Sequence, residues 1–182
     1  MNETKRMRSI VWAELAHACY WEQYISRYLG HRYDFNKLYS ILTIVLSSLG
    51  AFFIALSKSE YEWAVWAGIG CVVTVPVVQI VNSSQKHVMM DVDTASSLLR
   101  LRGLYLVYYD ELARLFLDID DLSLSEEQIK DRYFSIRRSA VDIERLKDSL
   151  NISRLNKVDR HAMRQMNKRL SHKFGTIGCL TA

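Results

Sequence analysis

The sequence predicts an all-α membrane protein built on a two-helix transmembrane hairpin. Two stretches, Leu38–Ser57 and Trp63–Gln85, contain none of the chain's 24 basic and 20 acidic residues. A helix needs about 20 apolar residues to cross a hydrocarbon layer about 30 Å thick, and each stretch is long enough. The seven glycines and one proline leave little turn material, which argues against a β-sandwich or a nucleotide-binding α/β domain.

Residues 1–36 are expected to form a cytoplasmic N-terminal helix that ends at Gly30. Apolar residues recur there at spacings of three, four and seven, as on a helix with one buried stripe: Val11, Leu15, Ala18, Ile25 and Leu29. Such a helix either packs on the other cytoplasmic helices or lies at the membrane surface. Packing is favoured, because basic residues do not dominate its polar face.

The two predicted membrane helices, residues 38–57 and 63–85, are joined by a five-residue acidic connection, residues 58–62. A connection this short makes a tight hairpin, so both termini lie on one side of the membrane. The flanks on that side are basic, with Arg27, Arg32, Lys37, Lys86, Arg100 and Arg102. The positive-inside rule therefore places both termini of this multi-pass protein in the cytoplasm. A cleaved signal peptide is not expected, because a charged, amphipathic segment precedes the first span.

Residues 86–182 are predicted to be a cytoplasmic helical region. An approximate heptad runs from Val88 to Phe116, so the second membrane helix is expected to continue as a long stalk. A turn at residues 118–125, with a capping-box pattern at Ser123–Glu126, precedes the next helix. That helix is expected to bury Ile129, Tyr133, Ile136, Ala140, Ile143 and Leu150. A last helix is expected to begin at Asn151 or Ser153 and to end before Gly175.

No catalytic constellation is present, so the chain is not expected to be an enzyme or to hold a cofactor or metal. The three cysteines have no metal or redox spacing. Asp118–Asp121 resembles the start of a calcium loop, but the sixth position is not glycine and the twelfth is Ile129 instead of glutamate.

Polar residues form a narrow stripe on each predicted membrane helix. Ser40, Thr43 and Ser47 share one face of the first helix, and Gln79 and Asn82 share one face of the second. Facing lipid, the two amides would leave polar groups unsatisfied, so they are expected to face protein or water. The stripes are candidates for the lining of a water-filled path, and close helix packing is the alternative. Pro76 removes an amide from the second helix, so a kink or hinge is expected there.

Charge is segregated along the cytoplasmic region. Residues 110–131 hold eight acids and two bases, and residues 151–182 hold seven bases and one acid. In the last helix, one face carries what we call the basic stripe: Lys157, His161, Arg164, Lys168 and His172. Another face carries an apolar stripe for docking: Leu155, Val158, Ala162, Met166 and Leu170. The basic stripe is predicted to bind a polyanion. Pairing with the acidic residues 110–131 and attraction to anionic lipid are the alternatives.

The layout as a whole resembles the SLATT family of two-transmembrane effectors from bacterial nucleotide-signalling defence. The resemblance rests on the amphipathic segment HACYWEQYISRYLGHRYDFNKLY, the span SILTIVLSSLGAFFIAL, the hairpin KSEYEW and the tail segment LLRLRGLYLVYYDELARLF. It implies a homo-oligomeric, pore-forming effector that permeabilises the bacterial inner membrane in anti-phage defence by abortive infection. It also implies a partner nucleotidyltransferase, whose cyclic nucleotide or oligonucleotide product regulates the membrane protein.

The function expected from the residues and the resemblance together is an ion channel. A two-helix hairpin cannot enclose an aqueous path alone, so a homo-oligomer is expected. A tetramer is the expected number, assembled through the spans and the helix from Val88 to Phe116. The alternative function is a non-conducting membrane scaffold that recruits a partner through its cytoplasmic helices.

Overall fold

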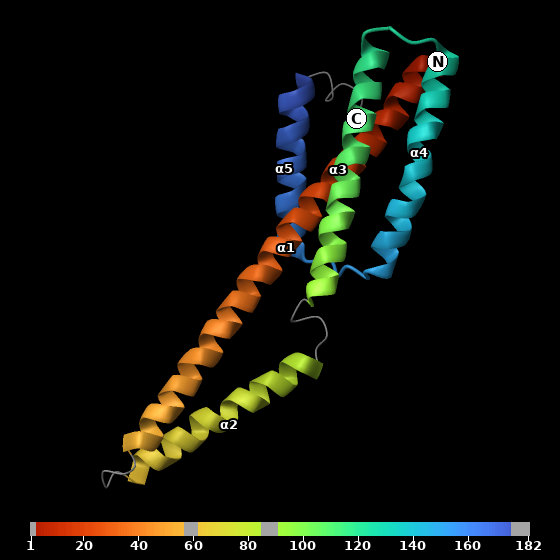
Figure 1. Cartoon of the computed structure of the whole chain (residues 1–182). Coiled ribbons are helices and arrows are strands. Elements are labelled where there is room, and N and C mark those ends of the chain that lie inside the picture. The colour runs from red at the N-terminus through yellow and green to blue at the C-terminus, as the bar shows by residue number, and fades with distance from the viewer. Residues whose placement is uncertain (1–2, 57–61, 85–90, 176–182) are drawn as a thin grey trace. The chain divides into compact units, whose positions relative to one another are not determined.

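The computed structural model describes residues 3–56, 62–84 and 91–175, with only the backbone given at residues 62, 64 and 78–84. Within these ranges the secondary structure is helical and contains no strand, so the predicted all-α class is confirmed. In chain order the helices are α1 (Glu3–Leu56), α2 (Glu62–Ser84), α3 (Val92–Asp120), α4 (Glu126–Ser149) and α5 (Asn156–Phe174) (Figure 1).

The chain divides into two compact units. Unit 1 consists of Met1–Leu29 together with Asp93–Ala182, and unit 2 consists of Gly30–Val92. The first part of α1 therefore belongs to unit 1, while the rest of α1 and all of α2 belong to unit 2. Unit 1 joins two segments that are far apart in the sequence.

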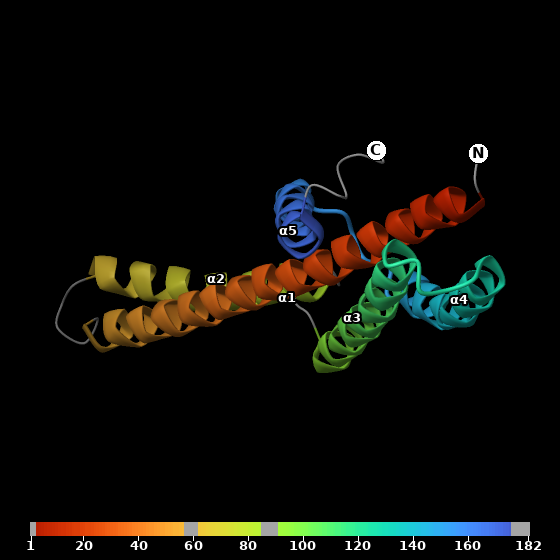
Figure 2. The same cartoon turned by 90° about the horizontal axis from the view of Figure 1, so that it is seen from above.

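Unit 1 is a helical bundle around an aromatic core. Both views show α4 and α5 on different sides of the first part of α1 (Figures 1 and 2). The Trp12 ring of α1 lies 5.1 Å from the Phe116 ring of α3 and 5.6 Å from the Phe174 ring of α5. The Tyr105 hydroxyl of α3 donates to the Glu144 carboxylate of α4 at 3.2 Å. Helices from both chain segments thus share one core.

The first part of α1 is packed as predicted. Val11, Leu15, Ala18 and Ile25 are completely buried in unit 1. Their spacing places them on one helical face, and the neighbouring Trp12 packs against rings of α3 and α5. Packing of this segment on the helices that follow the hairpin is therefore confirmed.

Two predicted helix boundaries are wrong. α1 continues through Gly30 to Leu56 as one helix. A glycine inside a helix costs only about 1 kcal/mol relative to alanine, which does not end a helix by itself. At the other end of unit 2, residues 85–90 lie outside the described residues, but Asp91 is not helical and α3 begins at Val92, so the predicted stalk is interrupted there. The Asp91 carboxylate accepts a hydrogen bond from the Val92 amide at 2.8 Å, which favours a fresh helix start.

The turn before α4 is confirmed at residues 121–125, but residues 118–120 belong to the end of α3, and the capping box lies two residues later than predicted. Ser125 is the N-cap: its hydroxyl accepts from the Gln128 amide, and the Gln128 side chain accepts from the Ser125 amide. Glutamine serves at this position as well as glutamate. α4 buries Ile129, Tyr133, Ile136 and Ile143, whereas Ala140 and Leu150 are only partly buried. α5 begins at Asn156, later than predicted, and ends before Gly175 as predicted.

In unit 2, α1 and α2 approach closely at two glycines. A Cβ atom added at Gly68 would lie 3.0 Å from a side-chain carbon of Ile54 and 3.3 Å from its backbone nitrogen. One added at Gly50 would lie 3.1 Å from the side chain of Val72. Small residues at such positions allow two apolar helices to pack backbone to backbone. The two helices of unit 2 therefore pack against each other at these glycines.

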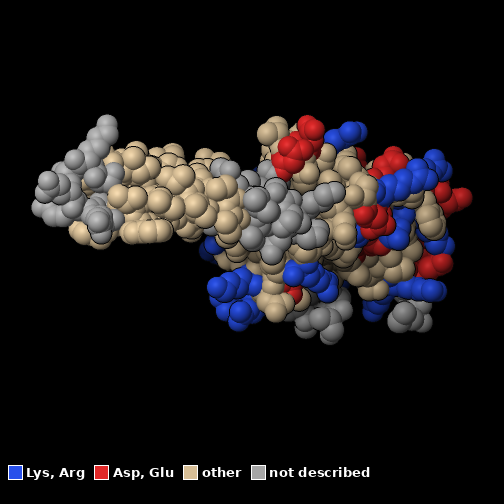
Figure 3. All heavy atoms as spheres, turned by 90° about the horizontal axis from the view of Figure 1, so that it is seen from below, with Lys and Arg blue, Asp and Glu red and all other residues tan. Residues whose placement is uncertain are grey.

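Much of the surface of α1 in unit 2 consists of exposed apolar side chains. In α1 the exposed large side chains include Leu38, Ile41, Leu42, Ile44, Val45, Leu49, Phe52 and Ile54. On the face shown in Figure 3, tan spheres cover the paired helices, while blue and red spheres lie over unit 1. Among the described residues one helix, α1, is long and apolar enough to cross a membrane, and only 6% of its most apolar stretch is buried. The apolar stretch identified in α2, Val65–Val77, is shorter, so the second span stays a prediction.

Candidate anion-binding site

The basic stripe lies on the outer surface of α5. All five of its side chains are exposed: Lys157, His161, Arg164, Lys168 and His172. Their spacings of four, three, four and four residues keep them on one helical face. The structure therefore places the five predicted residues on one exposed face of α5.

The opposite face of α5 fixes the helix to unit 1. Val158, Ala162 and Leu170 are buried, as the predicted apolar stripe requires, and Leu155 and Met166 are partly buried. Polar contacts hold the N-terminal end: the Tyr20 hydroxyl donates to the Asp159 carboxylate at 2.5 Å, and the Tyr24 hydroxyl donates to the Ser153 carbonyl at 2.9 Å. The basic stripe is thus carried by a docked helix.

Two of the eight acidic residues in 110–131 form ion pairs with helices other than α5. The Asp118 carboxylate contacts Arg132 of α4 at 2.6 Å, and the Asp120 carboxylate contacts Arg8 of α1 at 2.7 Å. Within the described ranges, one ion pair joins the acidic segment to α5, between Asp110 and Lys173 at 3.9 Å. Lys173 is not a member of the basic stripe. The alternative that the two charged segments neutralise each other therefore has little support.

A hollow of about 630 Å³ opens at the C-terminal half of α5. We call it the α5 hollow. Its walls carry four residues with cationic side chains or imidazole and two amides: Lys168, Arg169, His172 and Lys173, with Gln23 and Gln165. Lys168 and His172 are also members of the basic stripe, so the stripe leads directly into the hollow.

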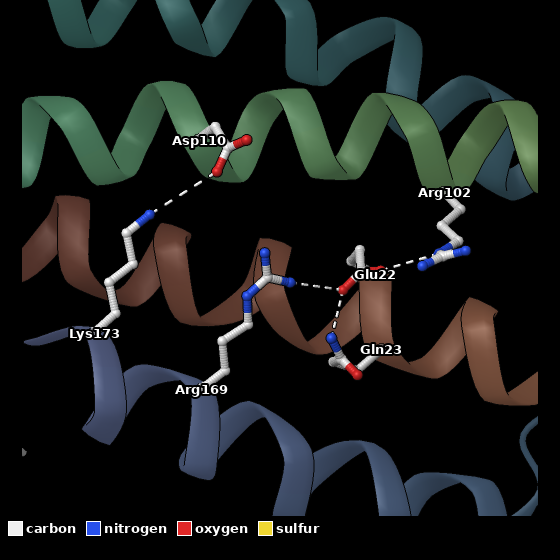
Figure 4. Close-up of polar contacts among 6 residues, drawn as sticks. All are labelled: Glu22, Gln23, Arg102, Asp110, Arg169 and Lys173. Atoms are coloured by element: carbon white, nitrogen blue, oxygen red, sulfur yellow. Dashed lines mark hydrogen bonds and ion pairs between the residues drawn. The ribbon is translucent and has the colours of Figure 1, made fainter.

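Behind the hollow lies a buried carboxylate. Glu22 is 2% exposed and accepts a hydrogen bond from Arg102 of α3 at 3.0 Å and one from Arg169 of α5 at 2.9 Å (Figure 4). The Gln23 amide also donates to it, at 2.5 Å. The Arg169 guanidinium lies over the Tyr109 ring, 4.5 Å from its centroid. One acid therefore connects three helices and orients an arginine at the wall of the hollow.

Sequence reasoning missed Glu22 and Arg169, although one signal was available. Glu22 follows Leu15 by seven residues and Ala18 by four, so it falls on the predicted buried stripe of the N-terminal helix. An acid on a buried face needs a cationic partner. Arg102 is a basic residue within the predicted heptad from Val88 to Phe116, and the structure shows that it is one of those partners.

The predicted pore-lining residues lie apart from this site, in unit 2. Ser40 and Ser47 are exposed on α1 and Thr43 is partly buried. The Ser40 and Thr43 hydroxyls each donate at 3.0 Å to the carbonyl four residues earlier in α1, at Asn36 and Tyr39. Such bonds satisfy a hydroxyl within its own helix, so its position alone does not require water.

The remaining predicted positions on α2 are only partly described. The Gln79 and Asn82 side chains lie outside the described residues. The helix is continuous across Pro76 from Glu62 to Ser84. A hinge at Pro76 stays a prediction. Among the described residues, no group of three or more His, Cys, Asp or Glu side chains is placed to hold a metal.

Comparisons of the chain with protein-family models, with curated proteins and with solved structures find no match.

Proposed function

We propose that the chain is a pore-forming protein of the bacterial inner membrane, regulated by an anionic ligand on its cytoplasmic side. Unit 2 crosses the membrane as a two-span hairpin, and unit 1 lies in the cytoplasm with both termini. Copies of the chain, four in the expected assembly, surround an ion path. The regulator is a nucleotide or oligonucleotide made by a partner nucleotidyltransferase, and the pore acts in anti-phage defence.

The observation that carries this proposal is the return of the chain to unit 1. The polypeptide leaves unit 1 after Leu29 and re-enters it at Asp93. Contacts between the two segments, such as Glu22 with Arg102, hold them in one bundle. A unit that stays on one side of a membrane can be left and re-entered only through an even number of crossings. The exposed apolar surface of α1 supports crossing of a membrane, and two is the smallest even number of crossings.

The lengths of the helices also support two crossings. From Leu38 to Leu56 α1 rises by about 28 Å, and the 23 residues of α2 rise by about 34 Å. Both values suit a hydrocarbon layer of about 30 Å. The polar residues near the end of α2 shorten its uninterrupted apolar stretch, and they would lie close to the interface or within an assembly.

Ion flux across liposomes containing the purified chain tests the pore. Ser47→Leu places a large apolar side chain on the candidate lining and is expected to reduce flux strongly, because hydrophobic constrictions exclude water. Ser48→Leu is the matched control on the same helix, also at an exposed position but off the stripe, and it is expected to keep the flux. Thr43→Leu and Gln79→Leu extend the series.

Two results would count against the proposal. Absence of flux from the wild-type chain at every protein density would favour the non-conducting scaffold. Full flux in Ser47→Leu, Thr43→Leu and Gln79→Leu would show that these faces do not line the path.

A further inference from the structure

We propose that the α5 hollow binds a terminal phosphate group, meaning a phosphomonoester or a pyrophosphate end. This inference rests on the proposed anionic regulator and specifies which part of it is recognised. Internal phosphodiesters of the same ligand would lie along the rest of the basic stripe, at Lys157, His161 and Arg164.

The charge at the hollow matches a terminal phosphate. Lys168, Arg169 and Lys173 line it, and Arg102 stands behind it, whereas the carboxylates of Glu22 and Asp110 contact these cations. Four cations against two carboxylates leave a net charge of +2. A phosphomonoester carries about −1.5 to −2 at neutral pH. An internal phosphodiester carries a single negative charge and would leave the hollow with excess positive charge.

The donors are held in place before any ligand arrives. The Arg169 side chain is 35% exposed, its NH1 group donates to Glu22, and its guanidinium is stacked over Tyr109. A guanidinium has five N–H donors in a fixed fork, so one bond to Glu22 leaves others for a phosphate. Glu22 acts as a positioning residue for Arg169. The Gln23 and Gln165 amides are further neutral donors at the wall.

Lys173 and Lys168 differ in the contacts that their ammonium groups make with neighbouring side chains. The Lys173 ammonium lies 3.9 Å from the Asp110 carboxylate and 4.9 Å from the centroid of the Tyr109 ring, so it stands at the same wall as Arg169. Lys168 is exposed and makes no ion pair within the described part of the chain. A phosphate entering the hollow would therefore meet one exposed lysine and two cations that the fold already positions.

The size of the hollow is suitable. A volume of about 630 Å³ lies within the usual range of small-molecule sites, roughly 300 to 1,000 Å³, and leaves room for a phosphate and the sugar that carries it. The stripe continues from the hollow toward the N-terminal end of α5, which gives an extended ligand a cationic track.

Paired oligonucleotides test this proposal on the full chain in nanodiscs of neutral lipid. The probes are short single-stranded DNAs of identical sequence with a 5′-phosphate or a 5′-hydroxyl. Wild type is expected to bind the phosphorylated probe about tenfold more tightly, as one or two charge-assisted hydrogen bonds would produce. Lys168→Ala is expected to remove most of this preference. Arg169→Lys keeps the charge near Glu22 but loses the fork, and should also reduce the preference.

The matched control is Arg164→Ala, which removes a cation from the stripe outside the hollow. It is expected to weaken both probes equally and to leave their ratio unchanged. Equal affinities of the two probes for wild type would overturn the terminal-phosphate site while leaving the polyanion regulator intact. Conversely, failure of both oligonucleotides to bind, with saturable pyrophosphate binding lost in Lys168→Ala, would support the hollow and contradict an oligonucleotide regulator. Neither result depends on ion flux.

A last arm identifies the source of the phosphate. Phosphatidic acid also presents a phosphomonoester, whereas phosphatidylglycerol presents only a diester. Weaker pyrophosphate binding in nanodiscs containing phosphatidic acid, compared with equal charge as phosphatidylglycerol, would identify a lipid headgroup as the ligand. Equal binding in the two would identify a soluble ligand. Absence of pyrophosphate binding in every nanodisc, together with equal probe affinities, would overturn the proposal.

Discussion

Glu22 is a carboxylate on the buried face of a helix, and its two arginine partners come from helices that follow it by about 80 and 147 residues in the sequence. The arginines keep 42% and 35% of their side-chain surface in solvent, so they can be rehydrated when the acid is removed. The Glu22 carboxylate is buried and cannot be hydrated by solvent in the same way. A buried charge is stable only with such partners. The stability of unit 1 should therefore depend strongly on this residue.

Glu22→Gln is expected to destabilise unit 1 by about 2 kcal/mol, because hydrogen bonds to a charged group contribute about 1.5–3 kcal/mol. For a chain of this size that corresponds to a fall in the thermal midpoint of roughly 4–8 °C. Circular dichroism of the purified chain in detergent measures it. Asp142→Asn is the control, since that side chain is 82% exposed and should change the midpoint little. Equal thermal midpoints for the two variants would show that the Glu22 carboxylate does not stabilise unit 1.

His17 makes the stability of unit 1 depend on pH. Burial lowers the pKa of this imidazole, against the opposing attraction of Glu144, and Lys147 lowers it further. The Trp21 indole donates to its Nε2 atom at 2.9 Å, which requires that nitrogen to be unprotonated. His17 lines a cavity of unit 1 together with Glu14 and Arg137, and these two residues form an ion pair with each other. Since the folded state favours the neutral ring, its contribution is complete above the ordinary histidine pKa of about 6.5 and is lost as pH falls.

Wild type should therefore lose more thermal stability than His17→Gln when pH is lowered from about 7.5 to about 5.5, a range that spans the ordinary histidine pKa. The difference between the two midpoint-versus-pH curves isolates this residue from other titrating groups. Parallel curves would mean that the ring is equally easy to protonate in the folded and unfolded chain.

The helix contact in unit 2 is governed by two glycines on facing helices. Gly68 has no room for a Cβ atom without movement of the Ile54 backbone or side chain, whereas Gly70, two residues later in α2, has nothing within 4 Å. The two positions lie about 200° apart around the helix. They offer a matched pair for testing whether α1 and α2 pack as described.

Gly68→Leu is expected to separate the two helices and to lower the yield and thermal midpoint of the detergent-purified chain. Gly70→Leu makes the same chemical change on the free face and is expected to resemble wild type. If both variants behave alike, the close approach of α1 and α2 at Gly68 is not what holds the pair together.

Sequence patterns predicted faces of helices better than their ends. The buried positions of the first part of α1 and of α5 follow from spacing alone, because a helix must hide its apolar face. The predicted helix end at Gly30 and the predicted continuous stalk were wrong because helix ends depend on small differences in free energy. A lone glycine is too weak to stop α1, and Asp91 beside Val92 was enough to begin α3 anew. The cap moved from Ser123 to Ser125 because Gln128 completes the box.

The candidate site was predictable where it depends on one helix and not where it depends on several. The basic stripe lies within α5, so its spacing was sufficient. The α5 hollow requires α1 to supply Gln23 and requires Glu22 to orient Arg169, and these contacts cross more than 140 residues. Sequence periodicity carries no information about which distant helices meet.

At the scale of the whole molecule, exposed apolar side chains predict that copies of the chain assemble into a homo-oligomer. Part of the predicted heptad, including Tyr109, Ala113 and Phe116, is used inside unit 1, while Val92 and Leu99 remain exposed on α3. The apolar surface of α1 is also uncovered within one chain. A homo-oligomer, with four copies as the expected number, would cover some of this surface. Mass measurement in mild detergent checks it: a monomer at every concentration would contradict assembly, and another closed number would correct only the count.

Labelling of single cysteines measures whether unit 2 crosses the membrane twice and leaves both ends of unit 1 in the cytoplasm. Single cysteines at Ser59, Ser9 and Ser171 report on the connection and on both ends of unit 1, in a chain with Cys71 and Cys179 replaced by serine. Cys19 can remain, because burial raises the pKa of its thiol to about 11 and keeps it unreactive. The reagent is a membrane-impermeant maleimide, applied to intact bacterial spheroplasts. The two-span topology predicts labelling of Ser59→Cys alone, and labelling of Ser9→Cys and Ser171→Cys only after permeabilisation. Protection of Ser59→Cys together with the other two, or labelling of Ser9→Cys and Ser171→Cys on opposite sides, would contradict it.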